Sequence, residues 1–210
     1  PVPPTFSENL DLVVAAARYL GVGDDALRRG IANARQAIGA LCVWPVPVEP
    51  GAGPTDRGPS RALLVNAFPA NDPTATMRVY DQVLASRGRE AGAGSAPGRP
   101  RCIGLLSLRA DRGERTLQWA DALAGGLLDR FDALLVTGLH APALARRVRR
   151  SGRGTARPGG APGPRQTPVR ILRHASAEEM TRAALEELGP SGGVVFGFGN
   201  IGGPGVELTE

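Results

Sequence analysis

The stretch CIGLLSLRADRGERTLQWADALAGGLLDRFDALLVTG, residues 102–138, decides the fold class. It opens and closes on short, continuous apolar runs, which are typical of strands buried on both faces of a parallel sheet. Between these runs, residues 113–131 repeat apolar side chains at helical spacing. A strand, a helix and a second strand in this order predict a parallel crossover unit.

The same alternation extends outward from this unit. Three further strand-like runs occupy residues 61–68, 169–174 and 193–199, and three further helical patterns occupy residues 73–88, 141–150 and 176–189. Five strands alternating with four helices are typical of a doubly wound domain. We therefore predict an α/β, Rossmann-like domain over residues 61–210, with a mostly parallel sheet and helices on both faces.

The chain before this domain has a different pattern. Residues 7–21 and 24–35 show helical periodicity, so we expect residues 1–48 to be a short helical segment. Two stretches rich in Gly, Pro and Arg, near residues 88–100 and 146–168, are expected to be flexible surface loops. The arginines of the second stretch leave two interpretations open, a solvated linker or a contact surface for anions or a partner.

Composition excludes several functions. All 25 residues counted as Lys or Arg are arginine, so the chain holds no P-loop lysine and no Schiff-base lysine. The two cysteines stand alone, and no apolar run reaches the length of a membrane span, so we expect a reduced, cytoplasmic setting. The net charge is +5, but no aromatic side chains accompany the arginines, and we expect no specific nucleic-acid binding.

Polar residues follow the predicted strands at their carboxyl ends, where doubly wound sheets bind ligands. They are Asn66, Asn71 and Asp72 after the first strand, Arg109, Asp111, Arg112 and Arg115 after the second, and Asn200 after the last. Each group also has a structural interpretation. The first could start a helix at Pro73, the arginines and Asp111 could form an ion-pair network, and His140 could be a surface or edge histidine with its hydrogen bonds satisfied.

The glycines Gly197, Gly199 and Gly202 have the G-x-G-x-x-G spacing of a dinucleotide fingerprint. That fingerprint needs a full helix and an acidic residue about twenty positions further on, and only eight residues follow Gly202. We therefore expect these glycines to allow a close approach of the backbone, or a positive φ, and not to bind a dinucleotide.

Three segments together resemble the ligase subunit of poly-γ-glutamate synthetase, a capsule-forming member of the Mur ligase superfamily. They are VNAFPANDPTAT (65–76), LRADRGERTLQWAD (108–121) and VVFGFGNIGG (194–203). Residues 6–31 also resemble the helix pair that closes the central ATPase domain of that family. The resemblance implies that residues 1–48 are the tail of this central domain and that residues 61–210 are the Rossmann-like C-terminal ligase domain.

The resemblance also implies the chemistry, which is ATP-dependent amide formation through an acyl phosphate, with glutamate and the poly-γ-glutamate chain as substrates. ATP and Mg²⁺ would be bound mostly by the domain upstream, so we expect this chain alone to be inactive. The resemblance also implies membrane subunits as partners, which would place the protein at the inner face of the membrane. The implied site comprises Asn66, Asn71 and Asp72 as catalytic residues, Arg109, Asp111, Arg112, Arg115, Gly197, Gly199, Asn200 and Gly202 as anion-binding residues, and no metal ligand. The alternative is a non-catalytic module that binds an anionic metabolite or partner.

Overall fold

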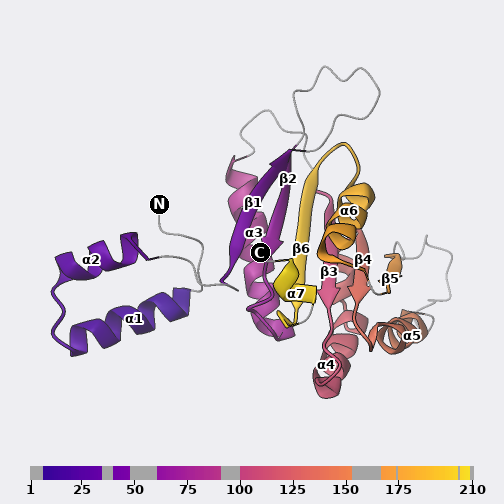
Figure 1. Cartoon of the computed structure of the whole chain (residues 1–210), viewed down its shortest axis with the longest axis horizontal. Helices are drawn as coiled ribbons and strands as arrows, with labels where there is room; N and C mark the ends of the chain where they lie inside the picture. Colours follow the sequence, from indigo (N-terminus) through magenta and orange to yellow (C-terminus); the bar gives the residue numbers. More distant parts are fainter. Residues whose placement is uncertain are drawn as a thin grey trace, which may run out of the picture.

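The structure is a computed structural model, and Figure 1 shows a layered α/β domain with a pair of helices beside it. It describes residues 7–34, 40–47, 61–90, 100–152, 167–173, 175–202 and 204–208. Residues 91–99 and 153–166, which make up most of the two predicted flexible loops, lie outside the described ranges. The account below concerns the described residues.

Six of the described segments are strands of one sheet, in the order β1-β2-β6-β3-β4-β5. They are β1 (Cys42–Pro47), β2 (Arg61–Asn66), β3 (Cys102–Ser107), β4 (Ala133–Thr137), β5 (Val169–Leu172) and β6 (Gly193–Gly199). β1 pairs antiparallel with β2, whereas the other four pairings are parallel. The predicted α/β fold with a mostly parallel sheet is confirmed.

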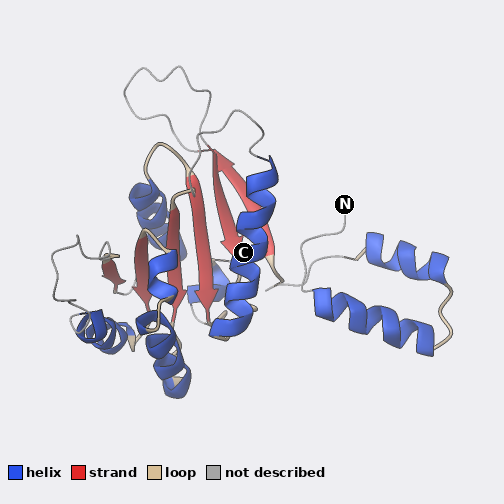
Figure 2. Cartoon of the chain, turned by 180° about the vertical axis from the view of Figure 1, so that it is seen from behind, coloured by secondary structure: helices blue, strands red, loops and turns tan. Residues whose placement is uncertain are grey.

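Helices cover both faces of this sheet, as predicted (Figures 1 and 2). The described helices of the domain are α3 (Pro73–Glu90), α4 (Gly113–Ala124), the 3-10 helix η1 (Leu127–Arg130), α5 (Ala141–Gly152), α6 (Ala177–Leu188) and α7 (Pro204–Glu207). Buried side chains of α3, α4 and α5 belong to one apolar cluster, and those of α6 belong to a second. The sheet therefore separates two cores.

Aromatic side chains fix β6 in the larger core. The rings of Phe131 and Phe198 stack with centroids 5.3 Å apart, and Trp119 lies 5.2 Å from Phe198. Tyr80 meets Phe196 edge to face and donates a hydrogen bond from its hydroxyl to the Arg130 carbonyl. Such aromatic pairs each contribute about 0.5–1.5 kcal/mol beyond the area they bury. The strand that carries the glycine motif is thus held firmly against α3 and α4.

The position of β6 brings three loops together. β6 lies between β2 and β3 and pairs parallel with both, with Asn66 opposite Gly197 and Ser107 opposite Gly199. The chain therefore passes over this position after β2 and returns to it after α6. The carboxyl ends of β2, β6 and β3 adjoin as a result, and ligands bind outside such ends in doubly wound sheets.

Two parts of the sequence-based prediction were wrong. Residues 42–47, placed within the helical segment 1–48, form the edge strand β1 instead. Pro45 and Pro47 hid this strand, because proline is uncommon in strands and is tolerated mainly at sheet edges. Residues 146–152, placed in a flexible loop, continue helix α5.

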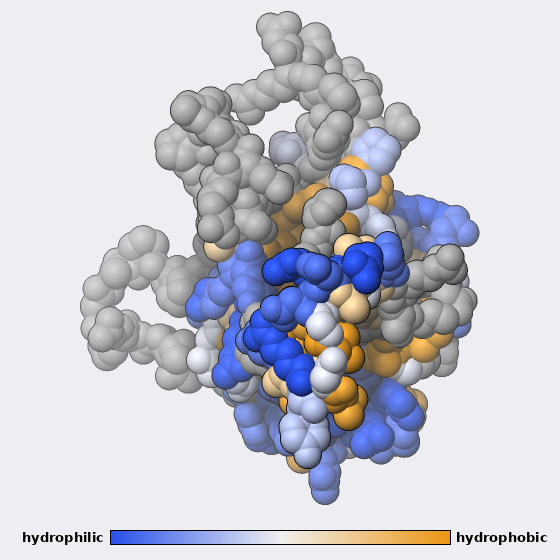
Figure 3. Space-filling model, turned by 90° about the vertical axis from the view of Figure 1, so that its left-hand side faces the viewer, coloured by the Kyte–Doolittle hydropathy of each residue, from blue (hydrophilic) through white to orange (hydrophobic). Residues whose placement is uncertain are grey.

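The helices α1 (Ser7–Tyr19) and α2 (Asp24–Ala32) lie beside the domain (Figure 1). An ion pair between Arg18 and Asp24 joins them. Leu12, Tyr19 and Leu20 are more than two-thirds exposed, and Figure 3, viewed from this side, shows apolar surface between hydrophilic side chains. These helices match the predicted helical segment, while their assignment to a separate central domain stays a prediction.

Candidate functional site

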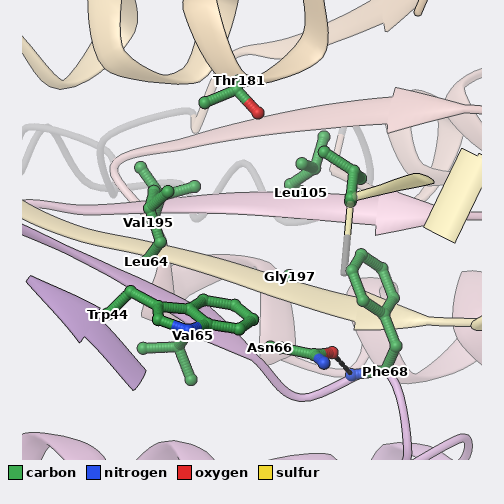
Figure 4. A pocket seen from close by; sticks show the side chains of 10 residues that line it. Trp44, Leu64, Val65, Asn66, Phe68, Leu105, Thr181, Val195 and Gly197 are labelled. Carbon is green, nitrogen blue, oxygen red and sulfur yellow. Dashed lines mark hydrogen bonds between the residues drawn. The ribbon is translucent and has the colours of Figure 1, made fainter. Parts of the chain in front are cut away.

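Asn66, the last residue of β2, organises the loop that follows. Its side chain is almost fully buried, its Nδ2 donates to the Ala40 carbonyl over 3.0 Å, and its Oδ1 accepts from the Phe68 N–H over 3.3 Å (Figure 4). The Ala67 N–H donates to the carbonyl of Gly197 on β6. The Asn66 amide therefore ties this loop to the segment before β1, which is a positioning role.

The hollow beside Asn66 is too small for a substrate. Trp44, Leu64 and Thr181 line it together with Asn66 on the face of the sheet that α6 partly covers (Figure 4). Its volume is about 40 Å³, and a single water needs about 10–15 Å³. It offers room for water molecules but not for an amino acid or a nucleotide base.

Asp72 caps helix α3. Its Oδ1 accepts a 2.9 Å hydrogen bond from the Ala75 N–H, three residues into the helix, which is typical of an N-cap. The Thr76 hydroxyl donates to the carbonyl of Ala70 in the loop before the helix. The structural interpretation of Asp72 as the start of a helix is therefore confirmed, and any catalytic role would come in addition to this cap.

The interpretation of Asp72 as a cap can be tested with two substitutions in this 210-residue chain. We expect Asp72→Ala to lower the free energy of unfolding by about 1 kcal/mol, because the helix loses a capping acceptor. Asp72→Asn keeps an acceptor and should stay close to the wild type in urea unfolding. A loss in Asp72→Asn as large as in Asp72→Ala would contradict the cap interpretation.

Arg109 and Asp111 form a two-point ion pair in the loop after β3. Arg109 Nε donates to Asp111 Oδ1 over 2.9 Å, and Nη2 donates to Oδ2 over 2.7 Å. This pairing lowers the pKa of Asp111 and raises the pKa of Arg109. Because the folded pKa of Asp111 is lowered, the contribution of the pair to stability is present above the ordinary aspartate pKa of about 3.9 and is lost as the pH falls through the lowered value. The pair is therefore intact at neutral pH.

Gly202 brings the loop after β6 against Arg109. A Cβ atom at Gly202 would lie 2.8 Å from Arg109 Nη1 and 2.9 Å from its Cδ, so a larger residue would displace the guanidinium. Neither hydrogen bond to Asp111 uses Nη1, which makes no hydrogen bond within the described ranges. The side chain of Arg109 is 39% exposed. Asp111 and Gly202 thus hold a guanidinium that still has donors available for an anion.

Two further arginines lie next to this pair in the chain. Arg112 Nε is 3.9 Å from Asp111 Oδ2, and Arg115, in the first turn of α4, donates from Nη1 to the Asn71 carbonyl over 3.2 Å. The Arg115 bond joins the loop after β2 to α4. The predicted ion-pair network is confirmed for Arg109, Asp111 and Arg112, whereas Arg115 links two strand ends through a hydrogen bond to a carbonyl.

Three buried polar atoms, near the ends of β3 and β6 and on α4, have no hydrogen-bond partner among the described residues. The Asn200 N–H donates to the Ser107 carbonyl, and both residues are at least 95% buried. Yet Asn200 Nδ2 and Ser107 Oγ make no hydrogen bond to the described residues, and neither does Trp119 Nε1. Leaving such a group unsatisfied costs about 1–3 kcal/mol, so each unpaired group calls for an explanation such as a bound molecule.

The structure brings most of the predicted site residues to one edge of the sheet. Arg109, Asp111 and Gly202 meet directly, and the loop of Asn66 contacts Gly197. Other residues have structural partners. His140 Nε2 donates to the Ala110 carbonyl over 2.9 Å and so holds the loop after β3, which agrees with the interpretation of His140 as a satisfied histidine.

Ser107 and Trp119, which carry two of the buried unpaired atoms, were not among the site residues predicted from the sequence. Ser107 carried a signal, because it is the polar residue that ends an otherwise apolar strand. Trp119 lies on helix α4 among apolar residues, and its buried N–H is visible only in the structure.

Comparison with known protein families shows which family the chain belongs to. A sequence model described as the poly-gamma-glutamate synthase CapB C-terminal domain matches residues 54–210, most of the chain. The chain belongs to this family. The family predicted from three short motifs is therefore confirmed, and the arginine-lined edge is part of a CapB C-terminal domain.

Two curated relatives of this CapB C-terminal domain share part of its sequence. The capsule biosynthesis protein CapB of Bacillus anthracis is 31% identical over 116 residues, which are 55% of this chain and 21% of that protein. PGA synthase CapB of Bacillus subtilis (strain 168) is 30% identical over 118 residues, which are 55% of this chain and 25% of that protein. The matched part thus spans a quarter or less of each relative.

Solved structures support the fold of the CapB C-terminal domain. A crystal structure of MurF from Acinetobacter baumannii superposes with a TM-score of 0.51 at 14% identity, covering 92% of this chain and 34% of that one. A second MurF crystal structure gives a TM-score of 0.50 at 17% identity, with 91% and 34% covered. At such identities the likeness concerns the fold, which agrees with the predicted Mur-type architecture.

Proposed function

We propose that this CapB C-terminal domain is part of an ADP-forming ligase that joins glutamate residues through γ-amide bonds. The observation that carries the proposal is the guanidinium of Arg109, held by Asp111 and Gly202 with Nη1 available, where three strand ends meet. The family match supports the reaction class, since the matched description is that of a poly-gamma-glutamate synthase.

The proposed reaction has two steps. A carboxylate oxygen of one substrate attacks the γ-phosphorus of ATP, which forms an acyl phosphate and releases ADP. The amine of the second substrate then attacks the acyl carbon, loses a proton and displaces phosphate, which leaves an amide. The attacking carboxylate, ATP, the acyl phosphate and the released phosphate all carry negative charge, and fixed cations stabilise such charge as it moves.

The residues of the site suit the anionic partners of this reaction. Arginine presents paired N–H donors that match carboxylate and phosphate oxygens. Arg109 would contact an anion directly, while Asp111 positions Arg109, and Arg115 fixes the loop after β2. Asn200 Nδ2 and Ser107 Oγ lie at the same edge but are buried, so they would contact a substrate only if this edge opened.

The described residues suit the binding of ATP phosphates better than the binding of Mg²⁺. The arginines fit the phosphates of ATP by charge and geometry. For Mg²⁺, no group of three or more His, Cys, Asp or Glu in the described ranges could hold a metal ion, so no step is assigned to Mg²⁺ here. The chain contains no lysine, so the P-loop lysine that we expect in the ATP-binding domain belongs to another part of the synthase.

Partner subunits at the membrane remain part of this proposal. Within the described ranges, no helix combines the length and the apolar character that crossing a bilayer requires. Association with the inner face of the membrane through partner subunits is proposed from the family resemblance, and the relative from Bacillus anthracis is named as a capsule biosynthesis protein.

The proposal is tested by glutamate-dependent ADP release. We expect a complete synthase that contains this domain to release ADP when glutamate is added, and this 210-residue chain alone to release none. ADP release by this chain alone would contradict the assignment of the phosphate-binding lysine to another part. A complete synthase that binds glutamate oligomers without releasing ADP would favour the alternative, a non-catalytic anion-binding module.

A further inference from the structure

A second cationic surface lies at the opposite edge of the sheet from β1, between α5 and β5 (Figures 1 and 2). It is a groove of about 350 Å³ lined by Pro142, Ala145, Arg146, Arg149, Arg150 and Ile171. None of these residues belongs to the carboxyl-edge site described above. We call this surface the α5 groove.

Within the described ranges, no carboxylate pairs with the arginines of the α5 groove. Its three arginines stand at i, i+3 and i+4 on α5, which places them on one side of the helix. Arg149 Nη2 donates to the Val169 carbonyl of β5 over 3.2 Å, whereas Arg146 and Arg150 have no ion-pair partner within the described ranges. Their neighbour Arg147 is different, because it pairs with Asp121 of α4 at 2.6 Å.

The floor of the groove is aliphatic. Buried Ala145 and half-buried Pro142 and Ile171 form it, and no aromatic side chain is among the described residues that line it. Single-stranded nucleic acids bind largely by stacking bases on aromatic rings, which this groove does not offer. A flexible chain with methylene groups along its backbone and carboxylates at its sides would match both the floor and the cationic rim.

We propose that the α5 groove binds the γ-linked glutamate chain, away from the bond-forming centre. This inference rests on the proposed function, because that function supplies a polymer of this chemistry. α5 begins four residues after β4 ends at the carboxyl edge, and Pro142 to Arg150 extends about 12 Å along the helix. A chain that leaves the carboxyl edge can therefore follow the groove, which retains the polymer between additions.

The test uses this 210-residue chain and a fluorescent γ-linked glutamate decamer, titrated by anisotropy in 0.15 M salt, where distant charges are screened. The variant Arg146→Gln/Arg150→Gln removes the two unpaired charges and leaves the Arg149 bond to β5 in place. The matched control is Arg170→Gln/Arg173→Gln, which removes the same charge from exposed positions at β5 that do not line the groove. All the replaced side chains are exposed, so circular dichroism should show the same fold in all three proteins.

We expect the groove variant to weaken decamer binding about fivefold or more, and the control to weaken it less than twofold. Equal losses in both variants would overturn the proposal, because charge alone would then explain binding. Tighter binding of oligothymidylate than of the decamer, or no saturable decamer binding, would also overturn it. The test measures binding affinity and does not depend on ligation. If the groove variant and the control bound the decamer equally while the complete synthase still ligated glutamate, the groove proposal would fail and the proposed function would stand.

Discussion

Replacing Arg109 with glutamine is expected to lower kcat/KM for glutamate addition by the complete synthase about 100-fold. Glutamine keeps a polar side chain but removes the charge and the paired donors. Removing one preorganised donor that faces developing negative charge costs about 100- to 1,000-fold in other enzymes. The loss should appear mainly in kcat if Arg109 contacts the anion as it forms, and mainly in KM if it binds the ground-state carboxylate. Steady-state ADP release at several glutamate concentrations separates the two.

The matched control for this variant is Arg182→Gln. Arg182 forms an ion pair of 2.6 Å with Glu178 on α6, compared with 2.7 Å for Arg109 and Asp111, and its side chain is 60% exposed, compared with 39% for Arg109. The control therefore removes the same charge from a more exposed surface position. We expect its kinetics and its thermal unfolding to equal those of the wild type, because exposed ion pairs contribute little. If Arg109→Gln behaved like this control, the carboxyl edge would not be the anion site.

The second large effect is expected at Gly199, where β6 ends. Gly199 has φ of +102°, and a Cβ there would collide with the carbonyl oxygen of Ser107 and lie 2.7 Å from Leu106 Cδ1. Alanine therefore adds backbone strain and also forces β3 and β6 apart at the centre of the sheet. We expect Gly199→Ala to lower the free energy of unfolding by about 3 kcal/mol or more, measured by urea denaturation of this 210-residue chain.

The variant Gly126→Ala separates the cost of backbone strain from the cost of the steric clash. Gly126 has a similar φ of +116°, but a Cβ there would meet no heavy atom within 4 Å. Its replacement isolates the conformational cost, which we expect to be about 1–2 kcal/mol. Equal losses at the two positions would show that the close packing of Gly199 against Ser107 adds nothing.

Much of the fold followed from the sequence, because buried parallel strands must be apolar along their whole length. Residues 102–138 show this directly, since all six residues of β3 are buried. β1 could not be recognised in the same way. It is an edge strand with two prolines and no fully buried residue, and its place in the sheet depends on pairing with β2, which local patterns do not encode.

The sequence predicted which edge of the sheet carries the candidate site, but not how its side chains contact one another. Parallel strands place the residues that follow them at one edge, so Arg109 and Asn200 could be assigned to that edge from spacing alone. The sequence could not show that Asp111 takes two donors of Arg109, or that Asp72 turns toward the helix that it caps. These choices depend on side-chain contacts between loops, and several arrangements satisfy the same spacing.

The central place of β6 also bears on how the chain folds during synthesis. Ala62 of β2 pairs with Gly193 of β6, so these partners are joined by more than half of the chain. Closing so long a loop is entropically costly, and such non-local pairings form slowly. Until residues 193–199 leave the ribosome, β2 and β3 each present an unpaired edge, which exposes the nascent chain to misassociation. β6 brings the loops of the candidate site together, and it is also synthesised late. Before it emerges, we expect the nascent chain to benefit most from a chaperone bound to the ribosome.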